Sequence, residues 1–167
     1  MEADVIINAL GKHFEHPDVQ AIVQKFGITK VPKAKADEPD SNLSAKKHGI
    51  ELGFIDADYL AGKKVARYGN ADMILYSATL YIKEGEPGYK EYQGTLPGGG
   101  RITDSIEEHI TRLGPATEIV EDEEEGDVLS RAWQFDGYWL SFSYNWKGEF
   151  RFAGLILEEY LTLMRSK

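Results

Sequence analysis

The clearest hydrophobic pattern in the second half of the chain is helical. Ile106, Ile110 and Leu113 recur at the spacing of one helical face, and a Gly-Pro pair follows as a stop signal. Asp104 stands at the expected capping position, with Glu107 at the capping-box position. The pattern therefore predicts a helix that begins after Asp104 and buries Ile110.

Strand-like alternation follows this helix. Alternating apolar and polar residues span residues 128–135, 138–145 and 149–157. An Asp-Gly pair separates the first two runs, and Asp-Gly between alternating runs is a strong hairpin signal. The runs predict a three-stranded antiparallel meander, and apolar residues at helical spacing predict a short closing helix over residues 158–165.

The first half shows the same order of elements with a weaker pattern. Pro17 suits the first position of a helix over residues 17–26, which Gly27 would end. Residues 30–44 contain little apolar material and favour a mobile loop. Strands are then predicted over three segments, residues 49–55, 72–82 and 89–96.

The two halves can be aligned as a weak repeat. Matching Gly27 with Gly114 places the apolar positions of one predicted helix on those of the other. The expected fold class is α+β, with two helix-plus-antiparallel-sheet repeats. The first unit covers residues 1–96 and the second covers residues 101–167 with the closing helix, and the alternative is one continuous domain. The glycine-rich stretch from Pro97 lacks the residues of a phosphate-binding loop and is interpreted as the link between the units.

Charge and composition narrow the function classes. The 167 residues include 19 Lys and Arg against 28 Asp and Glu, a net charge of −9, which disfavours nonspecific binding to nucleic acid or anionic membranes. A basic partner is the natural inference. The chain contains no Cys, which excludes disulfides, thiolate zinc sites and cysteine nucleophiles. Its first residues are acidic and their apolar run is short, so we expect no signal peptide and a cytoplasmic location.

The acidic run between Glu118 and Asp127 holds seven carboxylates and no basic residue. It lacks the ligand spacing of a calcium-binding loop, so no metal site is expected. It is either a solvated loop or a mobile charged segment that steers a basic partner. The carboxylates that we expect to contact such a partner are Glu121, Asp122, Glu123, Glu124, Glu125 and Asp127.

Aromatic residues give the second binding signal. In the run over residues 138–145, Leu140 and Phe142 lie on the face expected to be buried, between Tyr138 and Tyr144. The opposite face carries Trp139, Ser141 and Ser143, and Trp146 follows near the turn. An exposed Trp among small polar residues is typical of an interface anchor, and the alternative is that Trp139 is covered by other parts of the chain.

No catalytic constellation is evident. His109 falls on the polar side of its predicted helix, and no His stands in a pattern that suggests a triad. We therefore expect neither an enzyme nor a cofactor site.

The helix from Asp104 to Pro115, the runs Trp133-Gln-Phe and Tyr138-Trp-Leu-Ser-Phe-Ser-Tyr, and the segment Phe152-Ala-Gly-Leu-Ile-Leu together resemble a known module. Tandem units of this kind are similar to the beta-lactamase inhibitor protein and to small modules of outer-membrane assembly lipoproteins. The resemblance covers residues 103–157. This chain contains no Cys, and we expect neither a leader nor a lipobox, which argues against a secreted inhibitor and an envelope lipoprotein. Its acidic character is similar to that of bacterial immunity proteins, an analogy that does not by itself fix function.

The sequence therefore favours a non-catalytic inhibitory protein, an immunity protein that occludes a basic, nuclease-like toxin or another basic protein, with no direct contact to nucleic acid or membrane. The alternatives are a chaperone or assembly module that binds peptides on its sheet, and an enzyme of unknown type.

Overall fold

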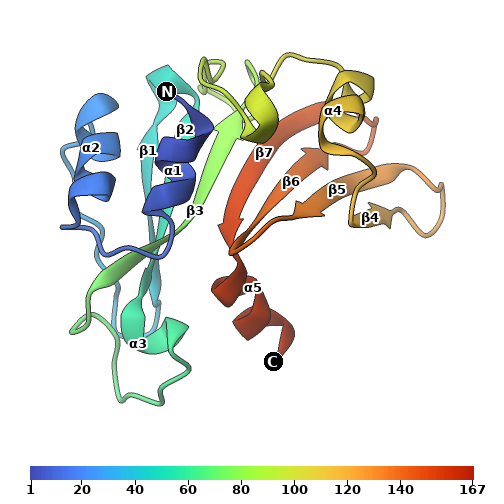
Figure 1. The fold of residues 1–167 in the computed structure, drawn as a ribbon. Helices are drawn as coiled ribbons and strands as arrows, with labels where there is room; N and C mark the ends of the chain where they lie inside the picture. The colour runs from blue at the N-terminus through green and yellow to red at the C-terminus, as the bar shows by residue number, and fades with distance from the viewer.

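The computed structural model describes residues 1–167 and contains one seven-stranded antiparallel sheet (Figure 1). The strand order is β1-β2-β3-β7-β6-β5-β4, so the last strands of the two chain halves meet in the middle. The strands are β1 (Asp40–Ala45), β2 (Ile50–Asp56), β3 (Met73–Tyr81), β4 (Glu118–Glu121), β5 (Val128–Gln134), β6 (Tyr138–Tyr144) and β7 (Phe150–Leu157).

Helices lie against the sheet and at one of its ends. The α-helices are α1 (Ala3–Ala9), α2 (Pro17–Lys25), α3 (Ala57–Leu60), α4 (Ile106–Leu113) and α5 (Glu158–Arg165), with short 3-10 turns η1 (Lys46–His48) and η2 (Pro97–Gly99). Figure 1 shows α1 and α2 beside β1 to β3, α4 beside β5 and β6, and α5 below the end of β7. None of these helices has both the length and the apolar character needed to cross a bilayer.

One hydrophobic core follows from the alternation of side chains along the strands. Leu52 of β2, Leu80 of β3, Leu140 of β6 and Leu155 of β7 are fully buried in the same cluster as Ile22 of α2. Because neighbouring residues of a strand point to opposite faces, the other face carries a different set of side chains. This face combines small residues such as Ser141 with large apolar ones, among them Trp139 of β6, which pairs with Ile156 of β7. Both chain halves contribute to this core, and the α+β fold class is confirmed.

Most element predictions in the second half are confirmed. The strands β5, β6 and β7 and the helix α5 occupy the predicted segments to within two residues. Leu140 and Phe142 are buried between the half-buried Tyr138 and Tyr144, as the alternation indicates.

Two predictions in the first half are wrong. Residues 89–96 form no strand. The Lys90 N–H donates to the Lys46 carbonyl and the Tyr92 N–H donates to the Tyr81 carbonyl, so these bonds go to different segments and form no ladder. The Tyr92 side chain packs into the core. Residues 30–44, predicted as a loop, contain most of β1, which pairs with β2 from Asp40 to Ala45. Leu43 and Ala45 form the buried apolar side of this strand. Two alternating apolar residues are too few to predict a strand from the sequence.

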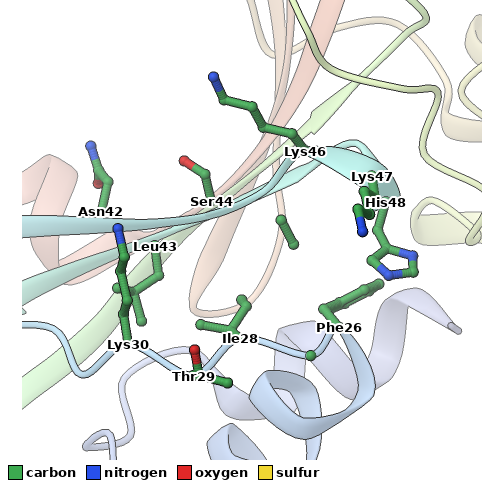
Figure 2. Close-up of a pocket in the computed structure, with 12 residues that line it drawn as sticks. Phe26, Ile28, Thr29, Lys30, Asn42, Leu43, Ser44, Lys46, Lys47 and His48 are labelled. Carbon is green, nitrogen blue, oxygen red and sulfur yellow. The ribbon is translucent and has the colours of Figure 1, made fainter.

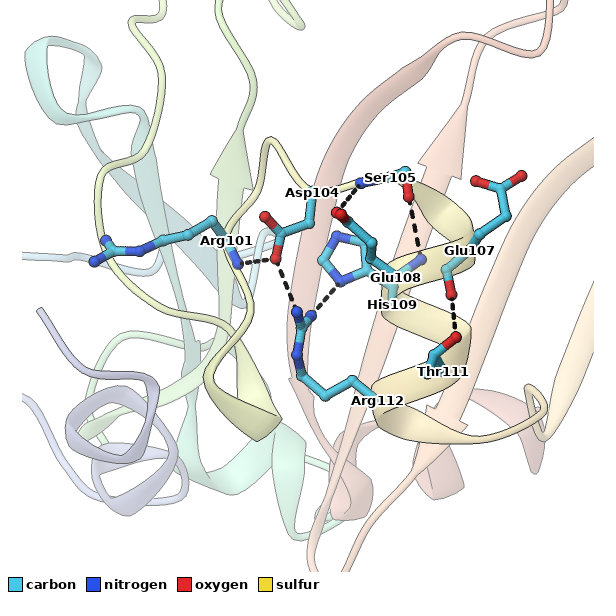
Figure 3. A network of polar contacts seen from close by, with 8 residues as sticks. All are labelled: Arg101, Asp104, Ser105, Glu107, Glu108, His109, Thr111 and Arg112. Carbon is cyan, nitrogen blue, oxygen red and sulfur yellow. Dashed lines mark hydrogen bonds and ion pairs between the residues drawn. The ribbon is translucent and has the colours of Figure 1, made fainter.

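The orientation of α4 also differs from the prediction. Ser105 and not Asp104 caps the helix, since its Oγ accepts from the Glu108 N–H at 3.1 Å and its own N–H donates to Glu108 Oε2 at 2.9 Å (Figure 3). Ile106 and Leu113 pack at the border of the core, so either position 109 or position 110 can point inward between them. The structure turns His109 inward and leaves Ile110 37% exposed.

This orientation predicts unequal effects of two truncations. Phe142→Ala should lower the free energy of unfolding by about 3–5 kcal/mol, because Phe142 is buried against Trp133 and Phe150. Ile110→Ala should cost less than about 1 kcal/mol, because surface truncations away from special contacts have small effects. Chemical denaturation of both variants measures the difference, and equal losses would contradict the orientation of α4.

Candidate functional site

The acidic run forms an ordered β-hairpin and not a loop. β4 pairs with β5, and the turn between them closes through a hydrogen bond from the Asp122 N–H to the Asp127 carbonyl at 2.8 Å. The Asp122 carboxylate accepts from the N–H groups of Glu124 and Glu125 at 2.9 and 2.8 Å, and these bonds hold the pKa of Asp122 below its usual range. Asp122 thus organises the turn, while its neighbours point their carboxylates into solvent.

Trp146 lies beside this turn, on the connection between β6 and β7. Asn145 shapes the connection, because its side-chain oxygen accepts from the N–H groups of Lys147 and Glu149, both at 2.9 Å. The Trp146 side chain is 75% exposed, and the Lys147 ammonium lies 5.0 Å from the centre of its ring. An indole this exposed contributes little to the stability of the fold.

A hollow of about 210 Å³ joins the two turns. We call its lining the acidic–tryptophan surface, and it consists of Asp122, Glu124, Glu125, Asp127, Leu129 and Trp146. The structure therefore brings together four of the predicted carboxylates with one of the predicted tryptophans. Glu121 and Glu123 are exposed in the same hairpin but do not line the hollow.

The prediction that Trp139 is exposed is wrong. Its side chain is 5% exposed, and the Arg165 guanidinium of α5 lies 5.0 Å from its ring centre. Arg165 also forms a bidentate ion pair with Glu118 at 3.1 and 2.9 Å, which holds α5 over this face of the sheet. Trp139 therefore belongs to the packing of α5.

Ser141 and Ser143 share the face of Trp139 and lie apart from the acidic–tryptophan surface. Both are half-buried within β6, where Ser141 pairs with Gly154 and Ser143 pairs with Ser130. They belong to a stretch of small residues on the sheet, and neither lines the hollow beside Trp146.

A polar network surrounds the buried His109 on α4 (Figure 3). The His109 ring packs edge-on against Phe142 with 4.7 Å between ring centres, and its Nδ1 lies 3.4 Å from Nη1 of Arg112. Arg112 in turn pairs with Asp104 at 3.1 Å. His109 Nε2 is buried and has no hydrogen-bond partner. The carboxylate of this network binds Arg112, so the arrangement differs from the acid–imidazole pair of a catalytic triad.

Elsewhere the chain forms no cluster of three or more His, Asp or Glu side chains placed to hold a metal ion. A second hollow, which was not predicted from the sequence, is a groove beside β1 lined by residues 26–30 and 42–48. The sequence feature that indicates this edge strand is the short alternation of the polar Asn42 and Ser44 with the apolar Leu43 and Ala45.

No protein-family model, no curated protein sequence and no solved structure matches this chain.

The buried imidazole predicts a loss of stability on acidification. Burial lowers the pKa of His109 below its ordinary value of 6.5, although Asp104 opposes this effect. The unfolded chain then binds the proton more readily than the folded protein, so the free energy of unfolding should fall as the pH drops from about 6.5 towards 5.

Replacement of His109 by Leu should reduce this slope, as measured by urea denaturation at several pH values. His48→Gln, at an exposed histidine, is the matched control and should leave the slope unchanged. An identical slope in the wild type and His109→Leu would show that His109 does not cause the pH dependence.

Proposed function

We propose that the protein is a non-catalytic inhibitory binding protein, an immunity protein that occludes a basic, nuclease-like toxin in the cytoplasm. One observation carries the proposal: carboxylates of the β4–β5 turn and the exposed Trp146 border the same hollow. Exposed aromatic anchors surrounded by polar groups are typical of energetic centres in protein interfaces. The net charge of −9 supports a basic partner.

Two parts of this surface would act at different stages of binding. The carboxylates of Glu124 and Glu125 would speed the encounter with a basic protein and pair with the cations that bind its substrate. Trp146 would fill an apolar pocket and slow dissociation. The Asp122 carboxylate accepts hydrogen bonds from the N–H groups of Glu124 and Glu125, and these bonds fix the backbone of the turn before a partner binds. A turn that is already ordered loses less conformational entropy on association.

We further propose that the chain consists of two related helix-plus-sheet units, similar to those of the beta-lactamase inhibitor protein. The strand order supports this, because β3 and β7 end the two series of strands and pair at the centre of the sheet. In each half a helix, α2 or α4, precedes the strands. Superposition of α2 and α4 together with their strands tests the proposal.

Affinity capture from the native cell tests the function. The captured protein should be basic, toxic when expressed alone and harmless when co-expressed with this chain. Weak binding to many extended peptides would instead favour the chaperone alternative, and turnover of a substrate would favour an enzyme.

Variants of the acidic–tryptophan surface should then distinguish residues that speed the association of a partner from residues that slow its dissociation. Glu124→Gln with Glu125→Gln should slow association about threefold or more at low salt and flatten its salt dependence. Trp146→Ala should weaken binding by about 2 kcal/mol, mainly through faster dissociation. Surface plasmon resonance with the captured partner measures both rates.

The matched control is Glu15→Gln with Glu159→Gln, which removes the same charge from exposed positions outside this surface. Thermal unfolding should be unchanged in all variants. The proposed surface is wrong if the control slows association as much as the turn variant and Trp146→Ala leaves dissociation unchanged.

A further inference from the structure

A groove of about 750 Å³ runs beside β1, which forms one edge of the sheet (Figure 2). One wall is the connection that follows α2, and the other is β1 with η1. Figure 2 shows Leu43 of β1 directed towards Ile28 across this space, while Phe26 and His48 meet at one end. The rings of Phe26 and His48 are 5.3 Å apart and close that end of the groove.

The edge of β1 carries main-chain groups without protein partners. The Asp56 N–H donates to the Pro39 carbonyl, and the strands pair in register from there. Hydrogen-bonded pairs alternate in an antiparallel ladder, so residues 41, 43 and 45 bond to β2. The N–H and C=O groups of Asn42 and Ser44 therefore point away from β2, on the stretch of β1 that lines the groove.

The opposite wall, residues 26–30, also has main-chain groups without main-chain partners. Ile28 N–H donates back to Val23 at the end of α2, but Thr29 and Lys30 form no main-chain hydrogen bond. Two extended stretches with available donors and acceptors thus border the same groove. An added strand could bond to β1 on one side and approach the connection on the other.

The charge of the groove is opposite to that of the whole protein. Lys30, Lys46 and Lys47 line it and are exposed, whereas the chain as a whole carries a net charge of −9. No carboxylate lines the groove. The charge therefore favours an acidic occupant.

Lysines on an edge strand can also prevent unwanted pairing. Here β1 itself, Asp-Ser-Asn-Leu-Ser-Ala, contains no Lys, Arg or Pro. The lysines stand on the opposite wall and after the end of the strand, which leaves the pairing edge of Asn42 and Ser44 unobstructed.

We propose that this groove binds an acidic segment of a partner protein, which adds to the sheet as an extended strand paired with β1. Main-chain hydrogen bonds to Asn42 and Ser44 supply affinity, and the three lysines select acidic residues. This surface lies on the opposite edge of the sheet from β4, so it does not depend on the acidic–tryptophan surface.

A fluorescent peptide of alternating Glu and Val tests the proposal, with a Lys-Val peptide as the charge-inverted control. The full chain should bind the Glu-Val peptide, and binding should protect the amides of Asn42 and Ser44 from hydrogen exchange. Lys30→Glu with Lys47→Glu should weaken binding about tenfold or more. Lys83→Glu with Lys147→Glu makes the same charge change outside the groove and should weaken it far less.

Asn42→Pro separates strand addition from charge attraction. It removes an N–H that points away from β2, and proline is tolerated on the open side of an edge strand. Peptide binding should weaken about tenfold while thermal unfolding stays close to that of the wild type. Should Asn42→Pro unfold the protein, amide protection in the wild type decides the question.

Four outcomes would overturn the proposal. These are no binding at peptide concentrations up to about 1 mM, equal binding of the Lys-Val peptide, binding without protection of the two amides, and self-association of the chain through the β1 groove in place of peptide binding. The last outcome would identify a second copy as the occupant.

Discussion

The pairing of β3 with β7 is the contact on which the rest of the structure depends. These strands come from different halves of the chain and pair from Ser77 with Ile156 to Tyr81 with Phe152. This register places Ala78 beside Leu155 and Leu80 beside Ala153, all fully buried, so one core extends across both halves. A slip of one residue would turn these side chains to the opposite face. Gly154 also leaves room for β6, the other neighbour of β7, because a side chain there would stand 2.8 Å from the hydroxyl oxygen of its partner Ser141.

The same pairing decides where the free edges lie. With β3 and β7 at the centre, β1 and β4 become the two ends of the sheet. Their surroundings have opposite charge: β4 leads into the carboxylates beside Trp146, and β1 is bordered by lysines. The two surfaces proposed for binding therefore lie at opposite edges of the sheet and differ in charge.

The helices explain why the exposed aromatic is Trp146 and not Trp139. Arg165 of α5 contacts the Trp139 ring and pairs with Glu118, so the end of the chain covers this part of the sheet. The turn that carries Trp146 lies beyond these contacts and stays open to solvent. Of the two tryptophans predicted to bind a partner, only Trp146 therefore remains a candidate.

The sequence by itself determined the local elements of the second half and the chemistry of the acidic–tryptophan surface. Alternation and the Asp-Gly turn depend on near neighbours, so β5, β6 and β7 were predictable, and the acidity of residues 118–127 is a matter of composition. Only the tertiary structure decided which residues face the core at α4, where helical spacing allows both His109 and Ile110. Only long-range packing buried Trp139, joined the acidic turn to Trp146 and turned a polar stretch into the edge strand β1. These outcomes depend on contacts between residues far apart in the chain, and periodicity carries no information about such contacts.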